Sequence, residues 1–353
     1  MKDGYFSKKI AEWYELHHRN LPWRDTRDPY KIWLSEIILQ QTRVIQGLPY
    51  YQDFIRNYPN VTALARAKEQ EVLRLWQGLG YYTRARNLHA CAKVIVEKHG
   101  GVFPHTYDTL IQLPGIGAYT AAAIASFAFD EKVAVVDGNV QRVLARVFGV
   151  DDNVSSPVGK NKFNSLANKL ISNDDPAIHN QAMMEFGALQ CVPGQPDCEN
   201  CIFRTECFAY KHDSQSILPV KRKKPRVRRR YFYYFLLRDG KKFLTVERKD
   251  NDIWKGLHDF PLHEENKATH PKKIIAKIFS RQPVGNVRIS EDYKHNLTHQ
   301  VIFARFIEID LDPDKIPDHW LRGAEARWRS IKSLEKIPKP VLISRYLQDN
   351  SIL

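Results

Sequence analysis

The sequence of 353 residues predicts two domains, a mostly helical N-terminal domain followed by an α/β domain. Three observations predict this division. Apolar residues recur at helical spacing through residues 1–211, and turn signals separate the periodic segments. A strongly basic run at 221–230 then breaks the pattern. Aromatic residues that favour strands follow this run, so the second domain is expected to contain a sheet.

The helical domain is predicted from its amphipathic segments. Apolar residues lie three or four positions apart at 32–38, 72–76 and 90–95, as they do on the buried face of a helix. Glycine-containing turn signals at 78–80 and 99–101 separate these segments. We therefore expect a succession of helices rather than strands up to residue 211.

A basic linker is placed at 212–228, because the run 221–230 holds eight basic residues in ten and reads as a solvated segment. The second domain then covers 229–353. It opens with the aromatic-rich segment 231–237, which predicts a strand. The dipeptide Asp239-Gly240 predicts a hairpin turn after this strand.

Further elements of the second domain follow from the same kind of pattern. Residues 243–246 complete the predicted hairpin, a helix is expected at 271–280, and strands are expected at 300–309. We find no internal repeat in the chain.

Composition narrows the class of protein. Hydrophobic residues make up 43% of the chain, which is enough for a buried core, but no apolar run is long enough for a membrane span. The first residues contain no apolar signal core, so we expect a cytosolic protein with no membrane partner. The formal net charge of +14 favours a polyanionic partner.

Four of the five cysteines are crowded between residues 191 and 207. Cys191, Cys198, Cys201 and Cys207 are separated by six, two and five residues, so short loops connect them. In a cytosolic protein this crowding predicts metal binding rather than disulfides. Structural zinc, an iron–sulfur cluster and simple buried thiols remain open on spacing alone. The fifth, Cys91, lies in a helical pattern and is expected in the core.

A glycine-rich turn precedes a strong helix-forming run. In Leu113–Gly117 the glycines Gly115 and Gly117 are one residue apart, and the run 120–125 follows them. Such a turn can direct backbone N–H groups at a phosphate from a helix N-terminus. An ordinary tight turn is the alternative that the two glycines alone do not exclude.

Two carboxylates are candidates for acid–base chemistry. Asp137 precedes the helical pattern 138–146, where it can be a helix N-cap, and a helix N-terminus favours its ionised form. Glu36 has apolar neighbours on a helix at 33–42, and burial would raise its pKa into the range of a general acid. A capping role for Asp137 and a solvent-facing Glu36 are the alternatives.

In this order along the chain, these motifs resemble the helix–hairpin–helix DNA glycosylases. Residues 113–117 resemble the hairpin of that superfamily, and 136–143 resemble its catalytic segment. Residues 21–42 resemble the MutY-type adenine DNA glycosylases in particular. The cysteine spacing after the expected helix 180–190 resembles the [4Fe–4S] loop of endonuclease III and MutY. The resemblance implies a two-lobed helical domain that carries this cluster.

The resemblance also implies roles for the site residues. Glu36 would protonate adenine at N7 and later activate water, and Asp137 would stabilise the cationic sugar, with Asn139 and Tyr119 in support. Tyr119 stands where the bifunctional relatives have a lysine, so strand cleavage is expected to be weak or absent. Further residues are expected to line the adenine pocket or to intrude beside the opposing guanine: Trp23, Arg24, Leu39 and Gln181 for the pocket, Gln41 and Tyr81 for the intrusion.

The second domain resembles the MutT-like, Nudix-fold reader of MutY enzymes through residues 246–261. The clustered glutamates of the Nudix metal site are not visible, so this domain is expected to bind rather than hydrolyse. Leu297, Thr298 and His299 stand where that family carries a Phe-Ser-His element that contacts oxidised guanine. The hydroxyl and the histidine are present in this chain, and the aromatic residue is not.

The sequence therefore predicts a monomeric base-excision-repair enzyme. It would remove adenine opposite 8-oxoguanine, or opposite guanine, from double-stranded DNA at the bacterial nucleoid. Two alternatives stand beside this prediction. An endonuclease III-like glycosylase/lyase for oxidised pyrimidines is opposed by Tyr119 and Glu36, and a non-catalytic iron–sulfur DNA-binding protein is opposed by the presence of both Glu36 and Asp137.

Overall fold

The computed structural model describes the chain apart from residues 1–2, 222–226, 250–251, 280–284, 311–315 and 322–325. Part of the expected basic linker, 222–226, therefore lies outside the described residues. The chain divides into two compact units, Met1–Ala65 with Ala90–Lys223, and Arg66–His89 with Lys224–Leu353. The predicted boundaries at 211 and 229 remain predictions.

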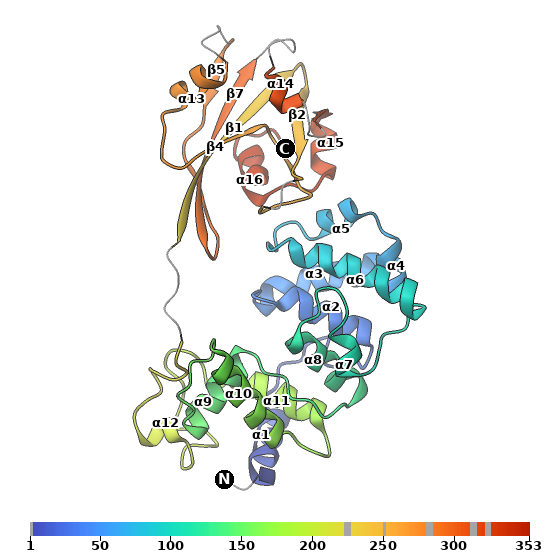
Figure 1. The fold of residues 1–353 in the computed structure, drawn as a ribbon, viewed down its shortest axis with the longest axis vertical. Coiled ribbons are helices and arrows are strands. Elements are labelled where there is room, and N and C mark those ends of the chain that lie inside the picture. The colour runs from blue at the N-terminus through green and yellow to red at the C-terminus, as the bar shows by residue number, and fades with distance from the viewer. Residues whose placement is uncertain (1–2, 222–226, 250–251, 280–284, 311–315, 322–325) are drawn as a thin grey trace. The chain divides into compact units, whose positions relative to one another are not determined.

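The first unit is helical (Figure 1). Its helices are α1 (Asp3–His17), α2 (Pro29–Leu39), α3 (Val44–Asn57), α4 (Val61–Arg66), the second part of α6 (Thr83–His99), α7 (Tyr107–Leu110), α8 (Ala118–Phe129), α9 (Gly138–Phe148), α10 (Pro157–Leu170), α11 (Pro176–Leu189) and α12 (Phe208–Lys211). The helices expected around 32–38 and 90–95 are confirmed as parts of α2 and α6.

Short polar side chains begin the helices that matter most for the site. Asp28, Asp137, Ser156 and Asp175 each accept a hydrogen bond from a backbone N–H in the first turn of the following helix. In α2, α10 and α11 a proline follows the cap, where its fixed φ suits the first helical position. The beginnings of α9 and α11 are thus fixed by local sequence.

Aromatic side chains form the core beneath the cysteine loop. Phe203, which lies between two of the clustered cysteines, stacks on Phe6 of α1 at a ring distance of 4.7 Å and meets Phe186 of α11 edge-on at 5.5 Å. Buried residues of α9 and α10 complete this core, against which Cys191 and Cys201 pack. The loop, the start of α9 and one face of α11 therefore share a single packed support.

The second unit contains a mixed sheet. Its elements are α5 (Glu69–Leu75), the first part of α6, β1 (Arg228–Asp239), β2 (Lys242–Glu247), β3 (His258–Asp259), β4 (Leu262–Glu265), α13 (Pro271–Ile278), β5 (Val287–Ile289), β6 (Tyr293–Asn296), β7 (Gln300–Asp310), α14 (Asp318–Leu321), β8 (Arg327–Ser330), α15 (Ile331–Lys336) and α16 (Val341–Asp349). The path of strands is β3-β2-β1-β7-β5, with β4 also on β1, β6 on β7 and β8 on β2.

The long strands β1 and β7 run parallel at the centre, with Arg228 opposite Gln300 and Arg238 opposite Asp310. Residues 232–237 of β1 are all buried, because both faces of these strands are covered. One face packs against Ile274 of α13. On the other, Tyr346 of α16 stacks on a β7 aromatic ring at 3.8 Å.

The predicted strands of this unit are confirmed. The hairpin at Asp239-Gly240 joins β1 to β2, and Gly240 takes a left-handed φ of 56° that suits glycine. The expected strand at 300–309 is β7. The helix expected at 271–280 is α13, which ends at Ile278. Residue 280, the last of the expected range, lies outside the described residues. Within the described ranges, no helix is both long and apolar enough to span a membrane.

Candidate active site

Glu36 is a buried carboxyl group on α2, with 7% of its surface exposed. Its Oε2 accepts a hydrogen bond of 2.6 Å from the hydroxyl of Tyr119, the second residue of α8. Burial raises the pKa of Glu36 to about 7 against the effect of the Tyr119 hydrogen bond, and the charge of Asp137 also raises it, whereas that of Arg24 lowers it. A carboxyl group with this pKa can be protonated near neutral pH and can therefore donate a proton.

Asp137 is the N-cap of α9 and is held by three hydrogen bonds. Its Oδ1 accepts from the backbone N–H groups of Asn139 at 2.8 Å and Val140 at 2.7 Å, and its Oδ2 accepts from the Asn139 amide at 2.8 Å. The helix N-terminus was expected to favour the ionised form, but desolvation outweighs these hydrogen bonds and raises the pKa of Asp137 above its ordinary value. The carboxyl groups of Asp137 and Glu36 therefore interact electrostatically, because the charge of Asp137 raises the pKa of Glu36.

Arg142, one turn into α9, orients Asn139. Its Nη2 donates to Asn139 Oδ1 at 2.8 Å and to the Gly187 carbonyl at 2.6 Å, and its Nε donates to the Cys191 carbonyl at 2.7 Å. The side chain is buried, with 5% exposed. A single guanidinium therefore connects the Asp137–Asn139 pair to α11 and to the first cysteine.

The residues expected at the base pocket come from the α1–α2 loop, α2 and α11. Trp23 is buried and meets an aromatic ring of α3 edge-on. Arg24 donates to Glu185 Oε2 at 2.6 Å, and Gln181 Oε1 accepts from the Tyr14 hydroxyl at 2.8 Å. Leu39, the last residue of α2, is half-buried. The first unit thus contains Trp23, Arg24, Leu39 and Gln181 together with both carboxylates.

The glycine turn has the expected local geometry. Gly115 takes a left-handed φ of 74°, and Ile116 N–H closes the turn on the Leu113 carbonyl at 3.1 Å. Gly117 is the N-cap of α8 and faces open space. The turn therefore requires a glycine at position 115, while Gly117 leaves room for a ligand to approach the backbone at the start of α8.

The four clustered cysteines are free thiols. Arg146 Nη1 lies 3.4 Å from Cys191 Sγ, and Phe203 N–H donates to Cys201 Sγ at 3.4 Å. Burial raises the pKa of Cys201 to about 12, and the charges of the neighbouring Cys191, Cys207 and Cys198 also raise it. Across the described residues, no group of three or more His, Cys, Asp or Glu side chains is arranged to hold a metal ion.

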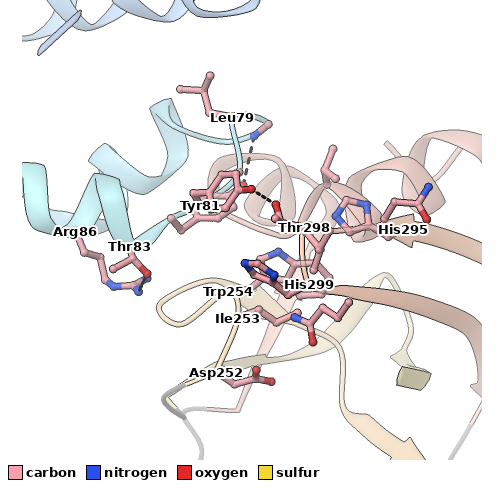
Figure 2. Close-up of a pocket in the computed structure, with 17 residues that line it drawn as sticks. Leu79, Tyr81, Thr83, Arg86, Asp252, Ile253, Trp254, His295, Thr298 and His299 are labelled. Carbon is pink, nitrogen blue, oxygen red and sulfur yellow. Dashed lines mark hydrogen bonds between the residues drawn. The ribbon is translucent and has the colours of Figure 1, made fainter. Parts of the chain in front are cut away.

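The second unit contains a pocket of about 410 Å³ around the turn between β6 and β7 (Figure 2). Leu297, Thr298 and His299 form this turn, in which Leu297 N–H donates to the Gln300 carbonyl at 2.8 Å. The hydroxyl of Thr298 is hydrogen bonded to that of Tyr81. Three of the residues expected to contact the lesion, Tyr81, Thr298 and His299, therefore line one cavity. Gln41 belongs to the other unit.

Family models match both parts of the chain. Residues 34–169 match the HhH-GPD superfamily of base excision DNA repair proteins, and residues 233–349 match a NUDIX domain. An adenine DNA glycosylase of Buchnera aphidicola subsp. Baizongia pistaciae is 33% identical, over 97% of this chain and 95% of the relative. This agreement extends over both units. The chain belongs to the adenine DNA glycosylase family.

Other relatives agree with this membership in the adenine DNA glycosylase family. The mouse adenine DNA glycosylase is 42% identical over 58% of this chain and 42% of its own length. A thermostable thymine-DNA glycosylase shares 31% identity with a TM-score of 0.55, over 59% of this chain and 96% of its own. Endonuclease III in a non-covalent DNA complex, at 23% identity and a TM-score of 0.50, over 59% of this chain and 95% of its own, shares the fold. The protein is thus a DNA glycosylase of base excision repair, with the predicted helical and Nudix-like folds.

Sequence reasoning missed two buried charged residues of this glycosylase, Arg142 and Glu185. Arg142 lies within the segment 136–143, and its position three residues after Asn139 places both side chains on the same helix face. No local sequence pattern predicts that Glu185 is buried and paired, because its partners Arg19 and Arg24 are more than 160 positions away. Only the folded chain reveals such contacts.

Gly187 on α11 packs closely against Asn139, which holds the candidate catalytic carboxylate Asp137. A Cβ added there would lie 2.6 Å from the Asn139 Cβ, which real Cβ atoms essentially never approach. We expect Gly187→Ala to displace Asn139 and to slow base release by about 10- to 100-fold, because small misplacements of catalytic groups cost about this much. Single-turnover base release measures the effect. Gly194→Ala, at a glycine with open space around it, should leave the rate unchanged, and a Gly187→Ala rate equal to wild type would contradict the assignment.

Proposed function

We propose that this enzyme hydrolyses the N-glycosidic bond of adenine paired with 8-oxoguanine, or with guanine, in double-stranded DNA. The observation that carries the proposal is the pair of carboxylates in different environments. Glu36 is buried with a pKa of about 7, and Asp137 is held by hydrogen bonds at the N-terminus of α9. Cleavage of a glycosidic bond requires such a pair, one acid and one anion.

The proposed reaction begins with protonation of the base. Glu36 donates its proton to N7 of adenine, and the C1′–N9 bond breaks with its electron pair moving onto the base. The carboxylate of Asp137 stabilises the positive charge that develops on the sugar. Water then attacks C1′ and gives its proton to the Glu36 carboxylate, which restores the acid. The products are adenine and an abasic site.

Tyr119 supports a monofunctional reaction without strand cleavage. Burial raises the pKa of its hydroxyl well above the ordinary value, and the hydroxyl donates to Glu36, so Tyr119 remains a neutral donor. Lys132, which follows Tyr119 in the sequence, donates to Asn173 at 2.5 Å on the exposed surface. An amine that could form a Schiff base with the sugar is therefore not supplied by either position.

Backbone conformation supports the proposed roles of Gln41 and Tyr81 in opening the duplex. Both residues take left-handed φ values, 55° and 50°, which are unusual for residues with a side chain. Strained conformations of this kind concentrate at functional sites. Both side chains are exposed. We assign them to the space beside the base opposite the extruded adenine.

The pocket around Thr298 is the proposed reader of the oxidised guanine. Its hydroxyl-bearing turn and the ring of Trp254, which faces His295, provide polar and flat apolar contacts of the kind a purine needs (Figure 2). The Leu297 side chain supplies aliphatic rather than aromatic surface at this turn. Recognition in this chain would therefore depend on Thr298, His299 and Tyr81.

Thr298→Val removes the hydroxyl and keeps the shape of the side chain. We expect the preference for 8-oxoguanine over guanine, measured as the ratio of single-turnover rates, to fall by about 2- to 12-fold, the worth of one net hydrogen bond. Thr269→Val removes a different hydroxyl of the same unit, outside this pocket. An unchanged ratio for Thr298→Val, or an equal fall for Thr269→Val, would contradict the reading role.

Two further features support binding of DNA. The turn at Gly115 and Gly117 offers backbone N–H groups to a phosphate of the target strand.

The four cysteines are proposed to hold a [4Fe–4S] cluster. The chemistry of the donors fits it, because the four cysteines are free thiols, the Phe203 N–H group donates to Cys201 and the Arg146 cation lies beside Cys191. When bound, the cluster would give the loop structural order.

We also propose that the enzyme acts as a monomer on the nucleoid of the bacterial cytoplasm.

The decisive experiment is single-turnover base release from duplexes carrying adenine opposite 8-oxoguanine, adenine opposite guanine, or an oxidised pyrimidine. Adenine release with strand breaks only after alkali is expected. Spontaneous nicking at the oxidised pyrimidine would instead identify an endonuclease III-like lyase. Absence of release from all three duplexes would identify a DNA-binding protein without this activity.

A further inference from the structure

Glu185 is a fully buried carboxylate that has no part in the chemistry above. It lies on α11 with none of its surface exposed. Its Oε1 accepts from the backbone N–H of Arg19 at 2.9 Å and from Arg19 Nε at 2.8 Å. Its Oε2 accepts from Arg19 Nη2 at 2.7 Å and from Arg24 Nη2 at 2.6 Å. One carboxylate therefore fastens two guanidinium groups of the loop between α1 and α2.

The charge of Glu185 is maintained by these partners. Burial opposes its ionisation, but the hydrogen bonds from Arg19 and Arg24 outweigh burial and lower the pKa of Glu185 to about 2. Charge-assisted, bidentate arginine–carboxylate pairs fix geometry as well as charge. Glu185 is consequently ionised at neutral pH, where it holds both arginines.

Arg24 is only partly used by these contacts. One N–H of its five goes to Glu185 and one to the Arg19 carbonyl at 3.2 Å. Among the residues that the structure describes, no hydrogen-bond acceptor takes the other three. Its guanidinium lies over the Tyr14 ring at 5.7 Å, and its charge reaches Glu36, whose pKa it lowers.

Gln181 is carried by the same face of α11, one turn before Glu185. Its Oε1 is held by the Tyr14 hydroxyl at 2.8 Å, so the ring that lies beside Arg24 also orients Gln181. Met184, between them on the helix, lies 4.0 Å from the Tyr119 hydroxyl that binds Glu36. Residues of α11 therefore contact both Arg24 and the Tyr119 hydroxyl that binds Glu36.

We propose that Glu185 is a positioning residue for base excision, which holds Arg24 so that its unused N–H groups meet the acceptor nitrogens of the extruded base. This inference rests on the proposed function and adds a residue that does not itself touch the base. An untethered arginine would sample many rotamers, and a misplaced donor loses its contact in the transition state.

The test is a double-mutant cycle on adenine release from the duplex with 8-oxoguanine, under single turnover. Glu185→Gln keeps the shape and removes the charge, and Arg24→Met removes the guanidinium. We expect each to slow release by about 10- to 100-fold, and the double variant to be no slower than Arg24→Met alone. Glu131→Gln, at a half-buried carboxylate that accepts from a backbone N–H, is the matched control and should retain the wild-type rate.

The pH profile separates positioning from a merely structural role. In Glu185→Gln a displaced Arg24 no longer lowers the pKa of Glu36, so the fall of the rate at high pH should move to higher pH. Affinity for a duplex with a 2′-fluorinated, unreactive adenosine should remain close to wild type. The positioning role would be overturned if the rate reductions of the two single variants multiplied in the double variant. It would also be overturned if the pH–rate profile of Glu185→Gln stayed in place or moved to lower pH.

Arg24→Lys provides a folded alternative if Glu185→Gln proves unstable. Lysine retains the charge beside Glu185 but lacks the planar fork, so release should again slow by about 10- to 100-fold. A wild-type rate for Arg24→Lys would overturn the inference. A wild-type enzyme that releases no adenine would overturn the proposed function itself, so the two failures are distinguishable.

Discussion

Asp137→Asn is expected to slow adenine release by about 100- to 1,000-fold, the scale seen when one electrostatic stabiliser of a transition state is removed. The amide retains an oxygen that can cap α9 toward the N–H groups of Asn139 and Val140, so the helix should still form. It carries no negative charge to stabilise the sugar cation. Single-turnover release and duplex affinity, measured together, separate chemistry from binding.

A matched control exists at the start of α11. Asp175 caps that helix by accepting from Ile178 N–H at 2.8 Å, as Asp137 caps α9, but it lies outside the site. Asp175→Asn should therefore leave release unchanged. If Asp137→Asn lost duplex affinity in proportion to its rate, the residue would be structural and the assignment as stabiliser would be wrong.

Glu36→Gln is expected to slow release by about 100- to 10,000-fold, the range of general acid–base catalysis. Glutamine can still accept the Tyr119 hydrogen bond, but it has no proton to give to the base. The effect should depend on the acceptor atom of the substrate. With 7-deazaadenine, which lacks N7, wild type and Glu36→Gln should be equally slow. A large difference between them on that base would place the proton transfer elsewhere.

The pH dependence follows from the same group. Because Glu36 acts in its protonated form and burial raises its pKa to about 7, the wild-type rate should be high below pH 7 and fall as the pH rises through that value. In Glu36→Gln this fall should disappear. A wild-type rate that rises across pH 7 would mean that the ionised form of Glu36 acts first.

Local patterns predicted the elements whose cause is local. The cap at Asp137, the glycine turn at 113–117 and the hairpin at Asp239-Gly240 each depend on a few adjacent residues, and the structure has all three. The apolar neighbours of Glu36 allowed its burial but left a solvent-facing side chain as the alternative, and the structure shows the buried one.

Features that depend on distant partners could not be predicted in this way. The pKa of Asp137 was expected to fall at a helix N-terminus, but the surrounding protein desolvates it more than the helix favours it. Likewise, the residues near Glu185 in the sequence do not predict its ion pairs with Arg19 and Arg24. The grouping of residues 66–89 with the C-terminal part is also a matter of tertiary contacts, since Gln70 donates to the Gly256 carbonyl at 3.1 Å.

Arg142 connects the cysteine loop to the candidate active site through hydrogen bonds. The same guanidinium ends on the Cys191 carbonyl and on the Asn139 side chain that steadies Asp137. Oxidation of the loop thiols would thus be expected to reach Asp137, the proposed stabiliser of the sugar cation, through three hydrogen bonds that pass by way of Arg142 and Asn139. We therefore expect the enzyme with oxidised loop thiols to release adenine more slowly than the reduced enzyme.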